Sequence, residues 1–121
     1  HVNLILSLGA GVYEEFLFRF ALMGLLFVSF GRLTSLKGTR LYVAAVLTQA
    51  VLFALFHHLP GGGEELTWTA LRSGEFVRAF AFRTLAGVYF AYLYQERGFG
   101  IAACSHAWFD VLAVMLNAFR R

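Results

Sequence analysis

The sequence has few charged residues, and this scarcity excludes most soluble folds. Only 14% of its 121 residues are charged, whereas 60% are hydrophobic. Soluble domains average about 25% charged and 45–50% apolar residues. A chain with this composition and a mean hydropathy of +0.68 cannot cover its outside with polar groups. We therefore expect an integral membrane protein.

Cysteine and proline are also scarce, with one of each. Cys104 has no second cysteine to pair with, so an internal disulfide and zinc sites built on paired cysteines are excluded. The net charge of +3 comes from basic residues that lie mostly at the ends of apolar runs. That placement is typical of helix ends at lipid headgroups and not of a nucleic-acid-binding face, which needs clustered bases. We expect membrane lipid, and no nucleic acid, as a partner.

Long apolar runs indicate how many times the chain crosses a membrane. A helix needs about 20 residues to cross roughly 30 Å of hydrocarbon. The second run ends before Pro60, and the third ends at Arg97, where the following Gly98 is favoured as a left-handed C-cap. The sequence predicts four helices, at approximately residues 3–30, 41–59, 76–95 and 99–119.

These helices predict an all-α, polytopic transmembrane bundle of about four antiparallel spans. Short connections at residues 31–40 and 96–98 make neighbouring helices antiparallel, while residues 60–75 form a longer, glycine-rich loop. The composition has no break, so we expect a single domain over residues 1–121. Because the chain begins at His1 rather than Met, we expect it to be a fragment of a larger bundle.

Several ionisable residues lie inside the apolar runs, where a bilayer disfavours them. Each costs at least about 2.5–3.5 kcal/mol at mid-membrane, so each needs a partner or a function. Several together indicate a polar cavity. The residues are Glu14, Glu15, Arg19, His106 and Asp110, with His57 and His58 near a helix end.

Helix spacing separates the two glutamates. Residues four apart lie about 40° from one another around a helix, whereas adjacent residues lie about 100° apart. Glu15 and Arg19 therefore share a face and can form a structural ion pair, which leaves Glu14 pointing elsewhere. A desolvated carboxylate is a good general base, so Glu14 is a candidate for activating water. The alternative is a structural hydrogen bond to a neighbouring helix.

The histidines allow both chemical and structural interpretations. His106 and Asp110 are four residues apart, so both can face one cavity, with Asp110 accepting a proton from the imidazole. The alternative is a buried pair that only holds helices together. His57 and His58 lie in the last turn before Pro60, and we expect one of them to sit at the headgroups or complement the helix C-terminus.

Familiar hydrolase motifs are missing from the sequence. It contains neither His-Glu-x-x-His nor Gly-x-Ser-x-Gly. Ser105 adjoins His106, but adjacent helix positions point about 100° apart, which disfavours a serine mechanism built on that pair.

Three short motifs resemble those of the CAAX protease and bacteriocin-processing family of intramembrane endopeptidases. Residues 14–19, EEFLFR, resemble its Glu-Glu-x-x-x-Arg motif; residues 53–57, FALFH, resemble Phe-x-x-x-His; and residues 106–110, HAWFD, resemble His-x-x-x-Asn/Asp. They occur in the family's order on separate apolar helices, and the resemblance covers nearly the whole chain. It implies a hydrolase, either glutamate-type or metal-dependent.

The resemblance implies a role for each matched residue. Glu14 would be the catalytic glutamate that activates water, with His57 assisting it. Glu15 and Arg19 would support the site. The peptide bond cleaved would lie in a lipidated or membrane-embedded substrate, such as a prenylated or transmembrane peptide, and we expect the protein in the plasma (inner) membrane of a prokaryote.

His106 and Asp110 would stabilise the oxyanion that forms when water attacks the peptide carbonyl. Asp110 departs from the family's frequent Asn, because Asp donates a hydrogen bond only when it is protonated. It could instead hold His106 in one tautomer or ligate a metal. A divalent metal is chemically possible, since Glu14, His57 and His106 would make an adequate Zn²⁺ site with an open water position.

Two other classes of function remain open at this point. In a proton-coupled transporter or channel, buried Glu, His and Asp residues would form a relay and would not activate water. Helix-breaking Gly or Pro residues in the middle of a span would favour a transporter or channel, and the only such residues are Gly24 and Gly87. A non-catalytic immunity or scaffold protein of the same fold would bind a peptide without cutting it.

Overall fold

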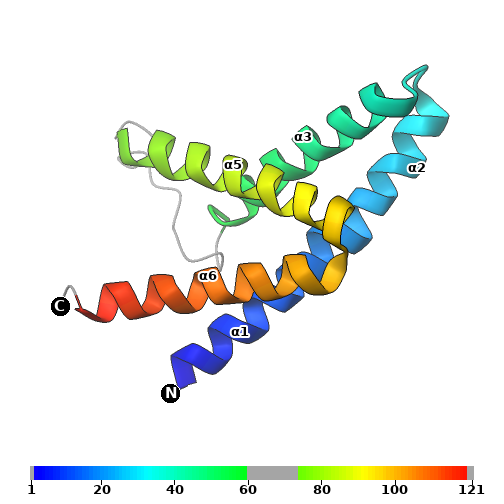
Figure 1. The fold of residues 1–121 in the computed structure, drawn as a ribbon. Helices are drawn as coiled ribbons and strands as arrows, with labels where there is room; N and C mark the ends of the chain where they lie inside the picture. The colour runs from blue at the N-terminus through cyan, green and yellow to red at the C-terminus, as the bar shows by residue number, and fades with distance from the viewer. Residues whose placement is uncertain (1, 60–73, 120–121) are drawn as a thin grey trace. The chain divides into compact units, whose positions relative to one another are not determined.

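The structure, a computed structural model, describes residues 2–59 and 74–119, which are almost all helical, and no strand occurs among them (Figure 1). Four helical segments are long and apolar enough to cross a membrane: Leu8–Leu33, Gly38–Phe56, Gly74–Arg97 and Phe99–Leu116. Many large apolar side chains are exposed, with Leu85 at 70% and Ile5 at 69%, as expected for surfaces that face lipid. The predicted all-α transmembrane fold is confirmed.

The first predicted span is helical over its whole length but contains an irregular middle. It consists of α1 (Val2–Glu15), the π-helix η1 (Phe16–Leu22) and α2 (Met23–Leu33). The sequence predicts one helix over residues 3–30, and this agrees with the observed helical extent of residues 2–33. The π-helix was not expected, because its wider i to i+5 turns leave no separate signal in a continuous apolar run.

The other three helices begin and end within a few residues of the predicted positions. They are α3 (Gly38–Phe56), α5 (Gly74–Arg97) and α6 (Phe99–Phe119). Helix α3 ends just before His57, and the chain continues as a tight turn in which the His58 amide donates to the Leu55 carbonyl at 3.0 Å. The predicted glycine-rich loop lies almost entirely in residues 60–73, outside the described residues.

Gly98 forms the corner between α5 and α6, as its position after Arg97 predicts. Its φ of +83° lies in the left-handed region that favours glycine. Its amide donates to the Tyr94 carbonyl at 2.9 Å, and its own carbonyl accepts a bond from Ala102 at 3.3 Å. One residue therefore ends one helix and begins the next.

The chain divides into two compact units, one made of His1–Gly24 and Phe90–Arg121 and the other of Leu25–Tyr89. In the first unit α1 packs against α6 through small residues. A Cβ added at Gly11 would lie only 2.8 Å from the Cα and N atoms of Ala107. Small residues let membrane helices approach closely, so this contact fixes the register of α1 on α6.

The second unit has a similar close contact between α3 and α5. A Cβ added at Gly87 would lie 3.0 Å from the Cα atom of Ala50. The fully buried Gln49 donates from Nε2 to the Gly87 carbonyl at 3.0 Å. Interhelical hydrogen bonds of this kind are common in membrane bundles. A single domain over the whole chain stays a prediction.

Candidate functional site

The first two candidate residues lie where the helix geometry changes. Glu14 and Glu15 are the last residues of α1, and η1 begins at the next residue. Phe18 and Arg19 are the buried residues of η1. π-helical turns are rare and occur frequently at functional sites. The π-helix η1 lies at the charged residues Glu14, Glu15 and Arg19, which are also the candidates from the sequence.

The predicted ion pair between Glu15 and Arg19 is present and fully buried. Arg19 Nε lies 3.2 Å from Glu15 Oε2, and both side chains have 0% of their surface exposed. The other carboxylate oxygen of Glu15, Oε1, accepts a hydrogen bond from His106 Nδ1 at 2.8 Å. Glu15 therefore joins the first span to α6.

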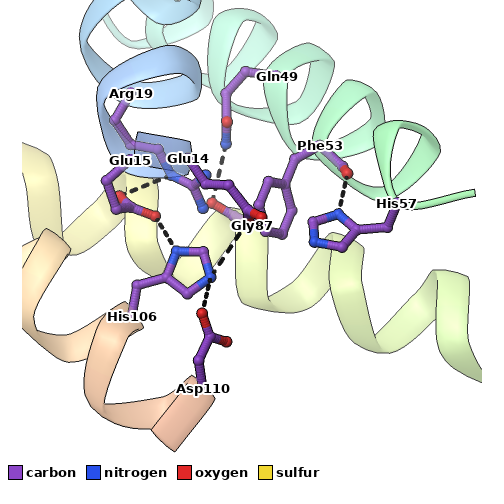
Figure 2. Close-up of polar contacts among 9 residues, drawn as sticks. All are labelled: Glu14, Glu15, Arg19, Gln49, Phe53, His57, Gly87, His106 and Asp110. Carbon is purple, nitrogen blue, oxygen red and sulfur yellow. Dashed lines mark hydrogen bonds and ion pairs between the residues drawn. The ribbon is translucent and has the colours of Figure 1, made fainter. Parts of the chain in front are cut away.

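His106 lies among three carboxylates (Figure 2). Its Nε2 atom lies 3.6 Å from Oε2 of Glu14 and 3.8 Å from Oδ2 of Asp110. The pairing of His106 with Asp110 agrees with their predicted shared face. Glu15 pairs with Arg19, as expected, and Glu14 points to a different atom, since the two glutamates lie at opposite nitrogens of one imidazole.

The Nε2 atom of His106 faces the carboxylates of Glu14 and Asp110. Because Nδ1–H donates to Glu15, a neutral ring presents a lone pair at Nε2 on this side. Ionised carboxylates only accept, so a hydrogen bond between Nε2 and either carboxylate needs a proton on one of the two groups. A proton so placed can be exchanged with a reacting group.

We call Glu14, Glu15, Arg19, His106 and Asp110 the His106 cluster. Its members differ in exposure: the side chains of Glu15 and Arg19 are 0% exposed, that of His106 5%, Glu14 16% and Asp110 28%. A reacting molecule can thus reach Glu14 and Asp110 more readily than Glu15. This gradient favours Glu14 over Glu15 as the residue that meets water.

Phe90 lies on the part of α5 that belongs to the first unit, and its place beside His106 was not expected from the sequence. Its ring stacks on the His106 imidazole with 4.5 Å between centroids and 15° between planes. The Arg19 guanidinium carbon lies 5.6 Å from the centre of the same ring. No local pattern distinguishes Phe90 among 14 phenylalanines, because its role depends on contacts between helices.

His57 belongs to the second unit, and whether it joins the His106 cluster stays a prediction. Its Nδ1–H donates to the Phe53 carbonyl at 2.9 Å, four residues back (Figure 2). The neutral ring therefore carries its lone pair on Nε2, as needed for a proton acceptor or a metal ligand. His58 is buried, and its ring lies 4.8 Å from that of Phe76 and 6.3 Å from that of Phe80. These contacts give His58 a packing role.

The predicted metal site, Glu14, His57 and His106, draws on both units. Among residues 2–59 and 74–119, no group of three or more His, Cys, Asp or Glu side chains is arranged to hold a metal ion. In the first unit, both His106 nitrogens face carboxylates. Zn²⁺ at these residues stays a prediction.

The fold and the cluster together define a polytopic helical membrane protein with acid–base groups inside its spans. A family model described as type II CAAX prenyl endopeptidase Rce1-like matches residues 2–112. The chain belongs to this Rce1-like family of membrane proteases, which acts on peptide substrates at the membrane. Comparisons with curated proteins and with solved structures found no match to the chain.

Proposed function

We propose that the chain is the catalytic core of an intramembrane endopeptidase in which Glu14 activates the attacking water. The observation that carries this proposal is the His106 cluster, in which Glu14 and Asp110 flank one nitrogen of a buried imidazole. A structural pair needs only two groups, and Glu15 and Arg19 already form one. The additional carboxylates are those of Glu14 and Asp110, which are the more exposed members of the cluster, so a substrate can contact them.

In the proposed reaction, Glu14 accepts a proton from water as the water oxygen attacks the carbonyl carbon of the scissile peptide. The carbonyl oxygen becomes an oxyanion. His106 stabilises it by donating from Nε2 when both ring nitrogens are protonated, and Asp110 stabilises it when protonated. Glu14 then delivers its proton to the leaving nitrogen as the C–N bond breaks. The products are a carboxylic acid and an amine, and Glu14 is again ionised.

The inner members of the cluster hold the outer ones in place. Glu15 holds the orientation of His106 by accepting from Nδ1, so that Nε2 is directed to the reacting side. Arg19 balances the charge of Glu15. In the second unit, His57 donates from Nδ1 to the Phe53 carbonyl. The family motif supports His57 as the residue that assists Glu14, or that binds Zn²⁺ in a metal-dependent form.

The proposed substrate is a peptide that carries a lipid, such as a prenyl group, or that is itself a transmembrane segment. Family membership supports a membrane-embedded peptide, and the four spans support a site within lipid. We further propose that the protein resides in the plasma (inner) membrane of a prokaryote.

The test is cleavage by the full-length protein, reconstituted in lipid, of peptides with prenylated or transmembrane tails. Wild type is compared with Glu14→Ala and Glu15→Ala, and a chelator is added in parallel. We expect wild type to cleave and Glu14→Ala, with its thermal stability retained, to be inactive. Activity that survives in Glu14→Ala would contradict the proposal, and chelator sensitivity would establish a metal. Proton or ion flux that is lost in Glu14→Ala, without any cleavage, would instead support a transporter.

A further inference from the structure

Phe90 contacts both groups of the His106 cluster that can carry positive charge. Its ring lies nearly parallel to the His106 imidazole, 4.5 Å away and inclined by 15°. The guanidinium carbon of Arg19 lies 5.6 Å from the centre of the phenyl ring. With only 4% of its surface exposed, Phe90 is a packed part of the cluster and not a lipid-facing side chain.

The stacking supplies a restraint that the hydrogen bonds of His106 do not. The bond from Nδ1 to Glu15 fixes one edge of the imidazole, but the ring can still swing about that bond. A flat ring packed against its face removes this freedom. The other edge then keeps Nε2 directed toward Glu14 and Asp110, which lie 3.6 and 3.8 Å away.

The chemistry of a phenyl face also suits its two neighbours. The face carries partial negative charge and attracts a guanidinium or an imidazolium. It offers no hydrogen-bond donor or acceptor that could compete for His106 or Arg19. A leucine at the same position would fill similar space without supplying a flat face or this field.

We propose that Phe90 is a positioning residue of the site, which holds the plane of the His106 imidazole and the Arg19 guanidinium so that His106 Nε2 faces the reacting groups. As a contribution to catalysis the inference rests on the proposed peptidase function. As a statement about the orientation of His106 it stands on the geometry alone. The two parts can therefore be tested separately.

The test compares Phe90→Leu with Phe90→Tyr in the full-length protein, with Tyr92→Leu as the matched control. Tyr92 lies on the same helix but is 55% exposed. We expect Phe90→Leu to lower kcat about 10- to 100-fold with little change in KM, because the reacting groups are misplaced while substrate binding is retained. Tyr92→Leu should keep kcat within a few-fold of wild type. Phe90→Tyr keeps the aromatic face but adds a hydroxyl, and it should retain more activity than Phe90→Leu.

Proton NMR of the His106 ring gives a readout independent of cleavage. Ring protons stacked on a phenyl face are shifted upfield, and a His106→Gln spectrum assigns them among the histidine signals. We expect the upfield shift in wild type and Phe90→Tyr and its loss in Phe90→Leu. If wild type fails to cleave but shows this pattern, the peptidase proposal fails and the orientation of His106 by Phe90 stands.

Two results would overturn the inference: His106 ring shifts that do not change in Phe90→Leu, or wild-type kcat in that variant when wild type cleaves. If Phe90→Leu does not fold, pentafluorophenylalanine at position 90 replaces it. That residue keeps the shape of the ring and reverses the sign of charge on its face. We expect a lowered kcat and altered His106 shifts there as well, and wild-type values for both would overturn the inference.

Discussion

The two ends of the His106 cluster differ in burial and in the length of their contacts. At the inner end Glu15 and Arg19 are 0% exposed and lie 3.2 Å apart. At the outer end Glu14 and Asp110 are 16% and 28% exposed and lie more than 3.5 Å from His106 Nε2, at 3.6 and 3.8 Å. One imidazole thus separates a tight structural charge pair from two looser carboxylates. We therefore expect Glu15 to stabilise the fold and the adjacent Glu14 to act in the reaction.

The largest expected contrast is between Glu14→Gln and Glu15→Gln. Glu14→Gln should lower kcat/KM about 10²- to 10⁴-fold, the usual contribution of a general base, with little effect on thermal unfolding. Glu15→Gln should destabilise the protein by about 3–5 kcal/mol, because it leaves the Arg19 charge buried without its anion. Peptide cleavage and thermal unfolding in detergent measure the two effects.

Both outcomes of this comparison are informative. Comparable losses of stability in the two variants would show that Glu14 is as structural as Glu15. Normal activity in Glu14→Gln would remove Glu14 from the reaction.

The inner pair should also show strong coupling in a double-mutant cycle. Arg19→Met alone leaves Glu15 charged and buried without Arg19 while keeping its contact with His106, whereas Glu15→Gln together with Arg19→Met removes both charges. We expect the double variant to be more stable than the sum of the single effects predicts, by about 0.5–3 kcal/mol. Unfolding free energies of the four proteins give this coupling. Additive effects would show that the pair contributes little.

Local geometry made part of this site predictable from the sequence. The pairs Glu15–Arg19 and His106–Asp110 depend only on i,i+4 spacing, which any helix provides. The corner at Gly98 followed from the need for a positive φ after a basic helix end. Helix extents followed from the length of apolar runs.

Contacts between helices could not be predicted in the same way. The spans are apolar around most of their circumference, so periodicity does not tell which face meets a neighbour. Two examples are the contact of Phe90 with His106 and that of Gln49 with Gly87. Such contacts depend on how each helix is rotated about its axis and how far it is shifted along it. The π-helix likewise has no signal of its own in a continuous apolar run.

A smaller effect is expected where α1 meets α6. Gly11→Ala places a Cβ 2.8 Å from backbone atoms of Ala107, which cannot move aside as a side chain would. We expect a loss of about 1–3 kcal/mol in stability and reduced cleavage, since the glutamates shift relative to His106. Gly9→Ala is the matched control, because nothing lies within 4 Å of its added Cβ. It should be neutral or stabilising by up to about 1 kcal/mol. Equal behaviour of the two variants would contradict the close packing.

The smallest expected effect is that of Asp110→Asn, and its dependence on pH decides the role of Asp110. Asn donates a hydrogen bond at any pH, whereas Asp donates only when protonated, and the protonated fraction falls as pH rises. If Asp110 stabilises the oxyanion as a donor, the ratio of Asp110→Asn activity to wild-type activity should rise with pH, with unchanged stability because Asp110 lies at the exposed end. If Asp110 instead accepts a proton from His106, the Asn variant should be the less active protein across the pH range. Cleavage rates of both proteins, measured over the same pH series, separate these roles.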